Sequence, residues 1–128
     1  MRKIRTLVAH NNEDVRKTIV DSISTLDYVE VVATAKDGIE TYDKIVKLKP
    51  EIVFSEYNYN NMSGLELIRK VKEKLKDRFP NFNTIGQIPE NELKEAIAII
   101  GDRLNAFVRQ PYNERVIEII KAYKEHNI

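Results

Sequence analysis

The chain has 128 residues with 21 lysines and arginines against 20 aspartates and glutamates, and a formal net charge of +1 gives no general attraction for nucleic acid or an anionic membrane. The absence of cysteine excludes disulfides, thiolate metal sites and cysteine nucleophiles. We expect one cytoplasmic domain over residues 1–128, because the length suits a single core and the sequence shows neither a membrane-spanning apolar run nor a signal-peptide pattern.

Two strand–helix pairs are predicted in the first fifty residues. Residues 4–9 form an apolar strand, and residues 10–12 leave that strand and cap a helix. Apolar side chains then recur at helical spacing through residues 15–26. Residues 29–35 form the second strand, and a second helix begins at residues 37–38.

The second half of the chain repeats this alternation. The predicted elements are a strand over 52–54, a helix through 65–75, a strand over 84–88, a helix through 93–100, a strand over 106–109 and a last helix. Ser63 is placed at the cap of the third helix and Asn113 at the cap of the last. Five strand–helix repeats predict an α/β fold with a doubly wound parallel sheet and helices on both faces.

Glu56 follows directly after the third predicted strand. Ligands of open α/β sheets bind just beyond the carboxyl ends of the strands, so this carboxylate is the first candidate for chemistry. Taken alone, a glutamate at this position could be a nucleophile, a metal ligand or an acid. The residues around Glu56 are needed to distinguish these three roles.

Four segments resemble the receiver domain of response regulators in bacterial two-component signalling. They are IRTLVAHNNEDVR, the dipeptide Asp37-Gly38, PEIVFSEYNYNNMSGLELI and AFVRQPYN. The resemblance covers essentially the whole chain and implies the five-stranded, flavodoxin-like fold of CheY-like proteins. It also implies a role in phosphorelay signal transduction, where a strand-end aspartate accepts a phosphoryl group beside a magnesium ion.

The resemblance places three polar residues at the metal positions of the family, and this chain departs from the family there. Glu56 corresponds to the phosphoacceptor aspartate, whereas His10, Asn11 and Asn58 correspond to the magnesium positions. Magnesium prefers charged oxygen ligands, so we expect no bound magnesium and no cofactor. Zinc or manganese on His10, Asn11 and Glu56 is less favoured than a loop histidine bonded to backbone or water.

The remaining chemical positions are altered as well. Counting back from Pro111 puts Ile88 at the family's hydroxyl position, or Gln87 if the register slips by one, and Gln110 replaces the lysine. A neutral amide cannot supply the charge that stabilises a phosphoryl oxygen, although Gln110 could donate a hydrogen bond to Glu56. The extra methylene of glutamate displaces its oxygen by roughly an ångström, which can cost on the order of a hundredfold in rate.

The fourth helix, fifth strand and fifth helix form the usual output face of the family. In this chain that face is predicted to carry Arg103, Phe107 at the aromatic switch position, Arg109, Tyr112, Arg115 and Tyr123. Arginine and tyrosine dominate interface energies. We therefore expect a protein partner or a homodimer on this face, with no direct contact to nucleic acid and none to a membrane.

The loop after Glu56 has two interpretations. Residues 57–62 are either a recognition surface, because tyrosine supplies contact area at low entropic cost, or a flexible polar loop. Glu56 itself is either a fixed mimic of the phosphorylated state or a polar residue at a strand end.

Three functions follow from these positions. The favoured one is a degenerate receiver that acts as a phosphorylation-independent interaction or dimerisation module, stand-alone or as the N-terminal part of a larger regulator, and is not an enzyme. The second is a weak phosphorelay receiver that uses Glu56. The third is a flavodoxin-like domain that binds a small ligand, although the HNNED turn lacks the glycines that let a phosphate approach the backbone.

Overall fold

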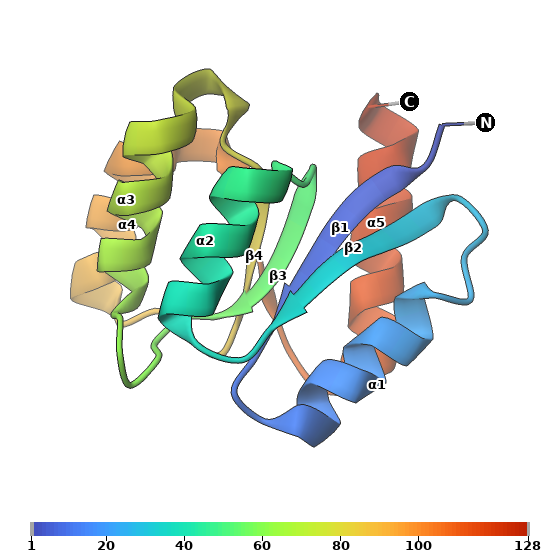
Figure 1. The fold of residues 1–128 in the computed structure, drawn as a ribbon. Helices are drawn as coiled ribbons and strands as arrows, with labels where there is room; N and C mark the ends of the chain where they lie inside the picture. The colour runs from blue at the N-terminus through green and yellow to red at the C-terminus, as the bar shows by residue number, and fades with distance from the viewer. Residues whose placement is uncertain (1, 128) are drawn as a thin grey trace.

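Strands and helices alternate along the whole described chain in a computed structural model of residues 2–127 (Figure 1). The strands are β1 Ile4–Ala9, β2 Val29–Ala35, β3 Ile52–Glu56, β4 Asn81–Ile85 and β5 Leu104–Val108. The helices are α1 Glu13–Ile23, α2 Gly38–Leu48, α3 Gly64–Leu75, α4 Glu90–Ile100 and α5 Tyr112–Asn127, with short 3-10 turns η1 Lys76–Arg78 and η2 Gly101–Arg103.

The five strands form one parallel sheet in the order β2-β1-β3-β4-β5. Helices α2, α3 and α4 cover one face, and α1 and α5 cover the other, as Figure 1 shows. The predicted doubly wound α/β fold is therefore confirmed. The strand order reverses between β1 and β3, which is where ligands bind in folds of this kind.

The third strand lies in the centre of the core, as its apolar run predicts. Val53 packs in the cluster under α2, α3 and α4, whereas Ile52 and Phe54 pack in the cluster under α1 and α5. Alternating side chains of one strand therefore serve both layers. This burial fixes the position of Glu56, which ends the strand at the carboxyl edge of the sheet.

Three helix starts confirm the predicted caps. The side chains of Asn12, Asp37 and Ser63 each accept a hydrogen bond from the backbone amide three residues later, at 3.0, 2.8 and 3.2 Å. These bonds satisfy amides that the first helical turn leaves without a partner. The short polar side chains in the sequence are therefore sufficient to locate the starts of α1, α2 and α3.

The fourth strand was predicted too late in the sequence. It spans Asn81–Ile85 rather than 84–88, because asparagines in a buried strand weaken the apolar pattern. Asn83 is nevertheless satisfied: its Nδ2 donates to the carbonyl of Val53 at 3.2 Å, and its Oδ1 accepts from Asn105 at 2.8 Å. Gly86, with φ of 101°, then turns the chain away from the sheet.

The last strand and helix also begin earlier than predicted. Strand β5 spans Leu104–Val108 rather than 106–109, and α5 starts at Tyr112. Asn113 is therefore a residue of the first helical turn and not its cap. The amide of Arg115 donates to the carbonyl of Pro111 at 3.3 Å, so the proline turn itself precedes the helix.

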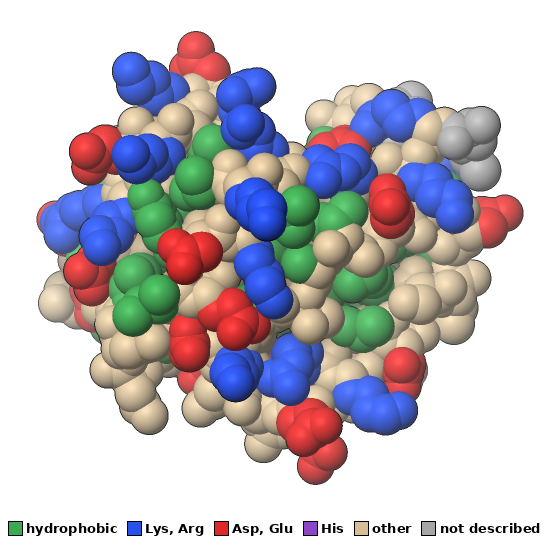
Figure 2. Space-filling view, in the orientation of Figure 1, with side chains coloured by type: hydrophobic (Ala, Val, Ile, Leu, Met, Phe, Trp, Pro, Cys, Tyr) green, Lys and Arg blue, Asp and Glu red, His purple; other side chains and the backbone are tan. Residues whose placement is uncertain are grey.

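The visible surface has no extended patch of one charge. Figure 2 shows acidic and basic side chains interspersed with apolar ones over the face that carries α2, α3 and the β1–β2 edge. Within residues 2–127, none of the helices combines the length and the apolar character needed to cross a membrane.

Candidate functional site

The structure brings His10, Asn11 and Glu56 together at the carboxyl edge of the sheet. Strand β1 ends directly before His10, and β3 ends at Glu56 beside it. The Glu56 Oε2 atom accepts a hydrogen bond from the backbone amide of Asn11 at 3.1 Å and lies 3.6 Å from His10 Nδ1. We call these three residues the Glu56 site. The predicted convergence is present, although Asn11 contributes its backbone to this hydrogen bond.

Backbone hydrogen bonds hold the His10 ring. Its Nδ1 accepts from the amide of Asn12 at 3.0 Å, and the His10 carbonyl accepts from Arg16 at 2.8 Å. Burial lowers the pKa of His10, the Glu56 carboxylate opposes that shift, and Arg16 adds to it. The ring is therefore a neutral acceptor at Nδ1, as in a loop histidine bonded to backbone.

The residues at the family's magnesium positions do not fit that ion. Asn58 turns its Oδ1 toward α3, where it accepts the amide of Gly64 at 2.9 Å. His10 offers a nitrogen that is already bonded to Asn12, so Glu56 remains the only charged oxygen ligand. Among the described residues, no group of three or more histidine, aspartate or glutamate side chains is arranged to hold a metal ion.

The end of β4 carries no hydroxyl next to Glu56. Ile85 ends this strand and pairs with Glu56 across the sheet, so Ile88 lies three residues beyond the strand rather than at its end. The hydroxyl position was therefore counted onto the wrong residue, because the chain between β4 and Pro111 is longer than the count assumes. Ile88 is buried in the core instead.

Gln110 does not reach the Glu56 site in this structure. Its side chain is exposed after β5, and the hydrogen bond described for the Glu56 carboxylate within residues 2–127 comes from Asn11. The hydrogen bond that the sequence suggested from the side-chain amide of Gln110 to Glu56 is absent from the described contacts. Within residues 2–127, no lysine or arginine forms an ion pair with Glu56, and the His10 ring beside it is neutral.

The tyrosines of the loop after Glu56 do not form an exposed recognition surface. Its apolar and aromatic members Tyr57, Tyr59 and Met62 are buried in the core. A Cβ at Gly64 would overlap the Tyr57 ring, so the glycine allows that ring to lie against α3. The recognition-surface interpretation was therefore wrong, because its tyrosines pack inward while the asparagines between them are exposed. The flexible-loop interpretation stays a prediction.

Tyr57 connects the Glu56 site to helix α4. It follows Glu56 in the chain, and its hydroxyl donates to the carboxylate of Glu92 on α4 at 2.8 Å. Burial and the hydrogen bond to Glu92 raise the pKa of Tyr57, so the phenol stays protonated and remains a donor. No pattern in the sequence indicates this contact, because the two residues lie 35 positions apart and meet only in the fold.

An apolar groove lies between α4 and β5. We call it the α4–β5 groove; it has a volume of about 330 Å³ and is lined by Thr84, Gln87, Ile88, Leu93, Ile97, Leu104, Asn105 and Phe107. Leu93, Ile97 and Phe107 are 36%, 49% and 43% exposed. Leu93 and Ile97 belong to the apolar line of α4, the helix that the sequence predicted through 93–100. The helix therefore directs part of its apolar line outward.

The predicted output face is only partly assembled as expected. Phe107 is exposed, and the Arg109 guanidinium lies 5.6 Å from the centre of its ring. Tyr112 is half-buried, and Arg115 pairs with Glu118 on the same helix at 3.1 Å. Two further predicted members lie elsewhere. Arg103 donates to the carbonyls of Asp77 and Phe79, and Tyr123 donates to Glu51, all at the amino edge of the sheet.

The chain is similar in sequence to segments of longer proteins. No family model matches the chain. It is 29% identical over 128 residues to protein-glutamate methylesterase/protein-glutamine glutaminase 1 of Methanospirillum hungatei, covering 98% of this chain and 36% of that protein. The protein of the same description from Archaeoglobus fulgidus is 32% identical over 96 residues, covering 75% of this chain and 27% of that protein. The chain thus spans about a third of these relatives.

Solved structures of similar fold match nearly the whole chain. The response regulator domain of Thermotoga maritima CheB has a TM-score of 0.76 at 21% identity, covering 97% of this chain and 96% of that one. The chemotaxis response regulator CheY4 of Vibrio cholerae has a TM-score of 0.74 at 20% identity, covering 94% and 98%. The chain therefore has the fold of CheY-like receiver domains, as the sequence resemblance implies.

Proposed function

We propose that this chain, with the fold of a receiver domain, acts in signal transduction by binding a protein through the α4–β5 groove without being phosphorylated. The first candidate for the partner is a second copy of the chain. The observation that carries the proposal is the exposure of Leu93, Ile97 and Phe107 around one groove. Contiguous exposed apolar side chains mark interaction surfaces in soluble proteins.

The composition of this surface supports protein binding. The α4–β5 groove has an apolar centre, and the amides of Gln87 and Asn105 stand beside it. Arg109 lies next to Phe107 and adds a residue type that is enriched in interfaces. An apolar centre with a polar rim is the usual anatomy of a protein interface, and truncating a central residue typically costs about 2 kcal/mol or more of binding free energy.

The Glu56 site supports independence from phosphorylation. In-line phosphoryl transfer needs a metal or a cation to neutralise the charge that develops on the phosphoryl oxygens. The described surroundings of Glu56 offer a backbone amide and a neutral imidazole instead. A permanent carboxylate at the end of β3 then supplies a fixed negative charge where the family switches one on and off.

Tyr57 connects the strand end that carries Glu56 to the helix that lines the α4–β5 groove. Its ring lies against α3, and its hydroxyl holds Glu92, one residue before Leu93 of the groove. A rigid contact of this kind keeps the start of α4 in one position. We propose that the domain is held in a single binding-competent arrangement rather than switched between two.

The experiment is sedimentation equilibrium of the wild type and two matched variants. Ile97→Lys places a charge in the α4–β5 groove, whereas Ile39→Lys places the same charge on α2 at an isoleucine that is 50% exposed. We expect a concentration-dependent dimer that Ile97→Lys weakens at least about tenfold and Ile39→Lys leaves unchanged. A monomer at every concentration, or equal effects of the two variants, would contradict the homodimer.

The activity in the names of the longer relatives is not part of this proposal. Those proteins are three to five times longer than the matched segment, as the coverage of 36% to 20% indicates. We propose no catalytic activity for this chain, no bound cofactor, no direct contact with nucleic acid, and a cytoplasmic location suited to a phosphorelay pathway.

A further inference from the structure

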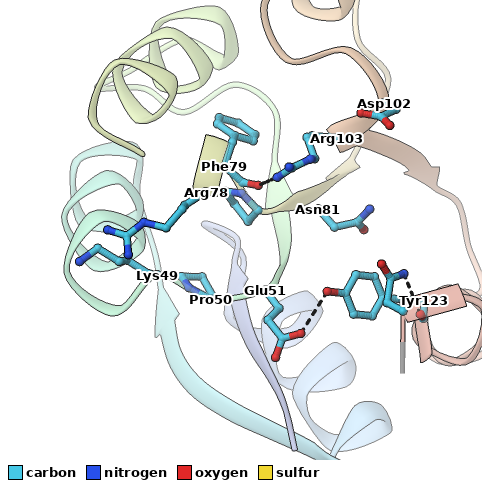
Figure 3. A pocket seen from close by; sticks show the side chains of 11 residues that line it. Lys49, Pro50, Glu51, Arg78, Phe79, Asn81, Asp102, Arg103 and Tyr123 are labelled. Carbon is cyan, nitrogen blue, oxygen red and sulfur yellow. Dashed lines mark hydrogen bonds between the residues drawn. The ribbon is translucent and has the colours of Figure 1, made fainter. Parts of the chain in front are cut away.

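A second cavity lies at the opposite edge of the sheet from Glu56. It has a volume of about 610 Å³ and opens between the amino ends of β3, β4 and β5 and the last turns of α5 (Figure 3). We call it the amino-edge cavity. Its size lies within the range of pockets that hold small molecules, which is roughly 300–1,000 Å³.

Three buried rings line one part of the amino-edge cavity. Pro50 precedes β3, and Phe79 and Pro80 precede β4, so the ends of two neighbouring strands place these rings together. Phe79 is fixed further by its tilted contact with Phe82, with ring centres 6.0 Å apart. Phe79 is 1% exposed, so these rings form a closed floor rather than a free face. The half-buried ring of Tyr123 also lines the cavity, and its hydrogen bond to Glu51 holds it in place, so this ring is the one on which a flat ring can lie.

Three cationic side chains line the same cavity. Lys49 and Arg78 lie on one side of it and Tyr123 on the other, as Figure 3 shows. Arg103 donates to two backbone carbonyls, which leaves its charge without a carboxylate partner. Within residues 2–127, no carboxylate forms an ion pair with any of the three cations.

The acidic group in the cavity is already compensated. Glu51 pairs with Arg2, which lies outside the lining, and accepts the hydroxyl of Tyr123 at 3.0 Å. Burial, together with this hydrogen bond, raises the pKa of Tyr123 to about 12, so its proton stays on the phenol. Asp102 remains as the second acidic side chain of the lining, against three cations.

Helix ends explain only part of this positive charge. Helix α2 ends at this edge and presents partial negative charge, but Lys47 in its last turn already meets that charge. Lys49 follows in the left-handed region, with φ of 50°, where glycine or asparagine would cost less. Arg78 has no hydrogen-bond partner among the described side-chain contacts, so both cations are free to meet a ligand.

We propose that the amino-edge cavity binds a small molecule that joins a phosphate group to a flat ring, of which a nucleoside monophosphate is the simplest example. Lys49 and Arg78 meet the phosphate, and the ring lies against the half-buried ring of Tyr123. Arginine suits phosphate because its planar donors match two oxygens at once. This inference does not rest on the proposed function, since the cavity lies at the other edge of the sheet from the Glu56 site.

The test is a titration of the full chain, followed by amide NMR, with AMP, adenosine and inorganic phosphate as separate probes. The side-chain amides of Asn81 and Asn127 line the cavity and serve as reporters. We expect AMP to produce saturable shifts, and adenosine and inorganic phosphate each to bind about tenfold more weakly. No saturable shift with AMP up to about 10 mM, or equal affinity for AMP and phosphate, would overturn the proposal.

A matched pair of variants assigns any binding to the cavity. Lys49 and Lys76 each follow a helix at positive φ, of 50° and 51°, but only Lys49 lines the cavity. Their ψ angles differ, at 60° and −117°, so glutamine is the matched substitution, because it removes the charge and keeps an unbranched side chain on each backbone. We expect Lys49→Gln to weaken AMP binding about tenfold and Lys76→Gln to leave it unchanged. Equal losses in both variants would refute the site.

Discussion

The Glu56 site and the α4–β5 groove differ in how far their side chains are satisfied within the domain. At the Glu56 site, the carboxylate and the imidazole already accept hydrogen bonds from the backbone amides of Asn11 and Asn12. In the α4–β5 groove, Ile97 and Phe107 are left 49% and 43% exposed. The polar atoms of the first region thus have partners within the domain, whereas the second region leaves apolar surface uncovered.

Because of this difference, the two regions call for different tests. Polar groups that accept hydrogen bonds from the backbone are held in place within the domain. Exposed apolar groups are not covered by any other part of the domain, so burying them against a partner removes apolar surface from water and is favourable. The predictions below test whether the first region is rigid and the second is independent of it.

The largest effect is expected where the loop packs on α3. Gly64→Ala would place a methyl group inside the space of the Tyr57 ring, and overpacking of this kind costs about 2–3 kcal/mol. Gly101→Ala is not a neutral control, because φ of 57° with ψ of −129° strains any side chain there by about 1–3 kcal/mol. The control is Gly64→Ala combined with Tyr57→Ala, since removing the ring should remove most of the added cost of the methyl group. Urea unfolding measures the variants. The same loss from Gly64→Ala with and without the ring would mean that the loop yields, and the Glu56 site would not be rigid.

A smaller effect is expected from the link between Tyr57 and α4. Tyr57→Phe keeps the ring on Gly64 but removes the hydrogen bond to Glu92, which we expect to cost about 1–2 kcal/mol in the free energy of unfolding. Glu92→Gln should cost less, because an amide oxygen can still accept. Self-association measured on Tyr57→Phe sharpens the comparison: weaker dimers show that the loop supports the groove, and unchanged dimers show that the groove stands alone.

Alkaline pH should lower the free energy of unfolding by ionising the buried tyrosines of the loop, which lie outside the α4–β5 groove. Burial and neighbouring carboxylates raise the pKa of Tyr57 above the ordinary value of 10.0, and burial raises that of Tyr59 to about 12. A raised pKa in the folded state means that the stabilisation is complete below pH 10 and is lost as pH rises from 10 toward 12. Urea unfolding across that range should show the loss, and Tyr59→Phe should reduce it. A flat profile would contradict the burial of these phenols.

The smallest effect concerns the charge of Glu56. The carboxylate opposes the lowering of the His10 pKa, so Glu56→Gln should lower that pKa further, whereas Glu13→Gln on the exposed first turn of α1 should leave it unchanged. Proton NMR of the imidazole measures both. A rise in the His10 pKa in Glu56→Gln would mean that the two side chains do not face each other as the structure shows.

The fold was predictable because local signals agreed with it. The apolar runs of β1 and β2 and the capping side chains of Asn12, Asp37 and Ser63 lie where the sequence indicates. Strand β4 was misplaced by three residues because Asn81 and Asn83 owe their place in the sheet to hydrogen bonds across it, which a hydrophobic pattern cannot register.

The sequence was enough to predict which residues meet at the Glu56 site, but not how the surrounding loop and helix pack. Strand ends bring His10, Asn11 and Glu56 together, and the order of elements is enough to see this. The inward packing of Tyr57 and the exposure of Ile97 depend on tertiary contacts instead. Helical spacing shows that α4 has an apolar side, but it does not show how much of that side the sheet covers.

The central claim is that Glu56 does not accept a phosphoryl group. The direct measurement is the intact mass of the protein after incubation with magnesium and a small phosphodonor such as acetyl phosphate. We expect an unchanged mass, together with the same dimer fraction with and without the donor. A mass increase of one phosphoryl group that peptide mapping assigns to Glu56, and that Glu56→Gln abolishes, would contradict the claim and restore this domain to the phosphorelay.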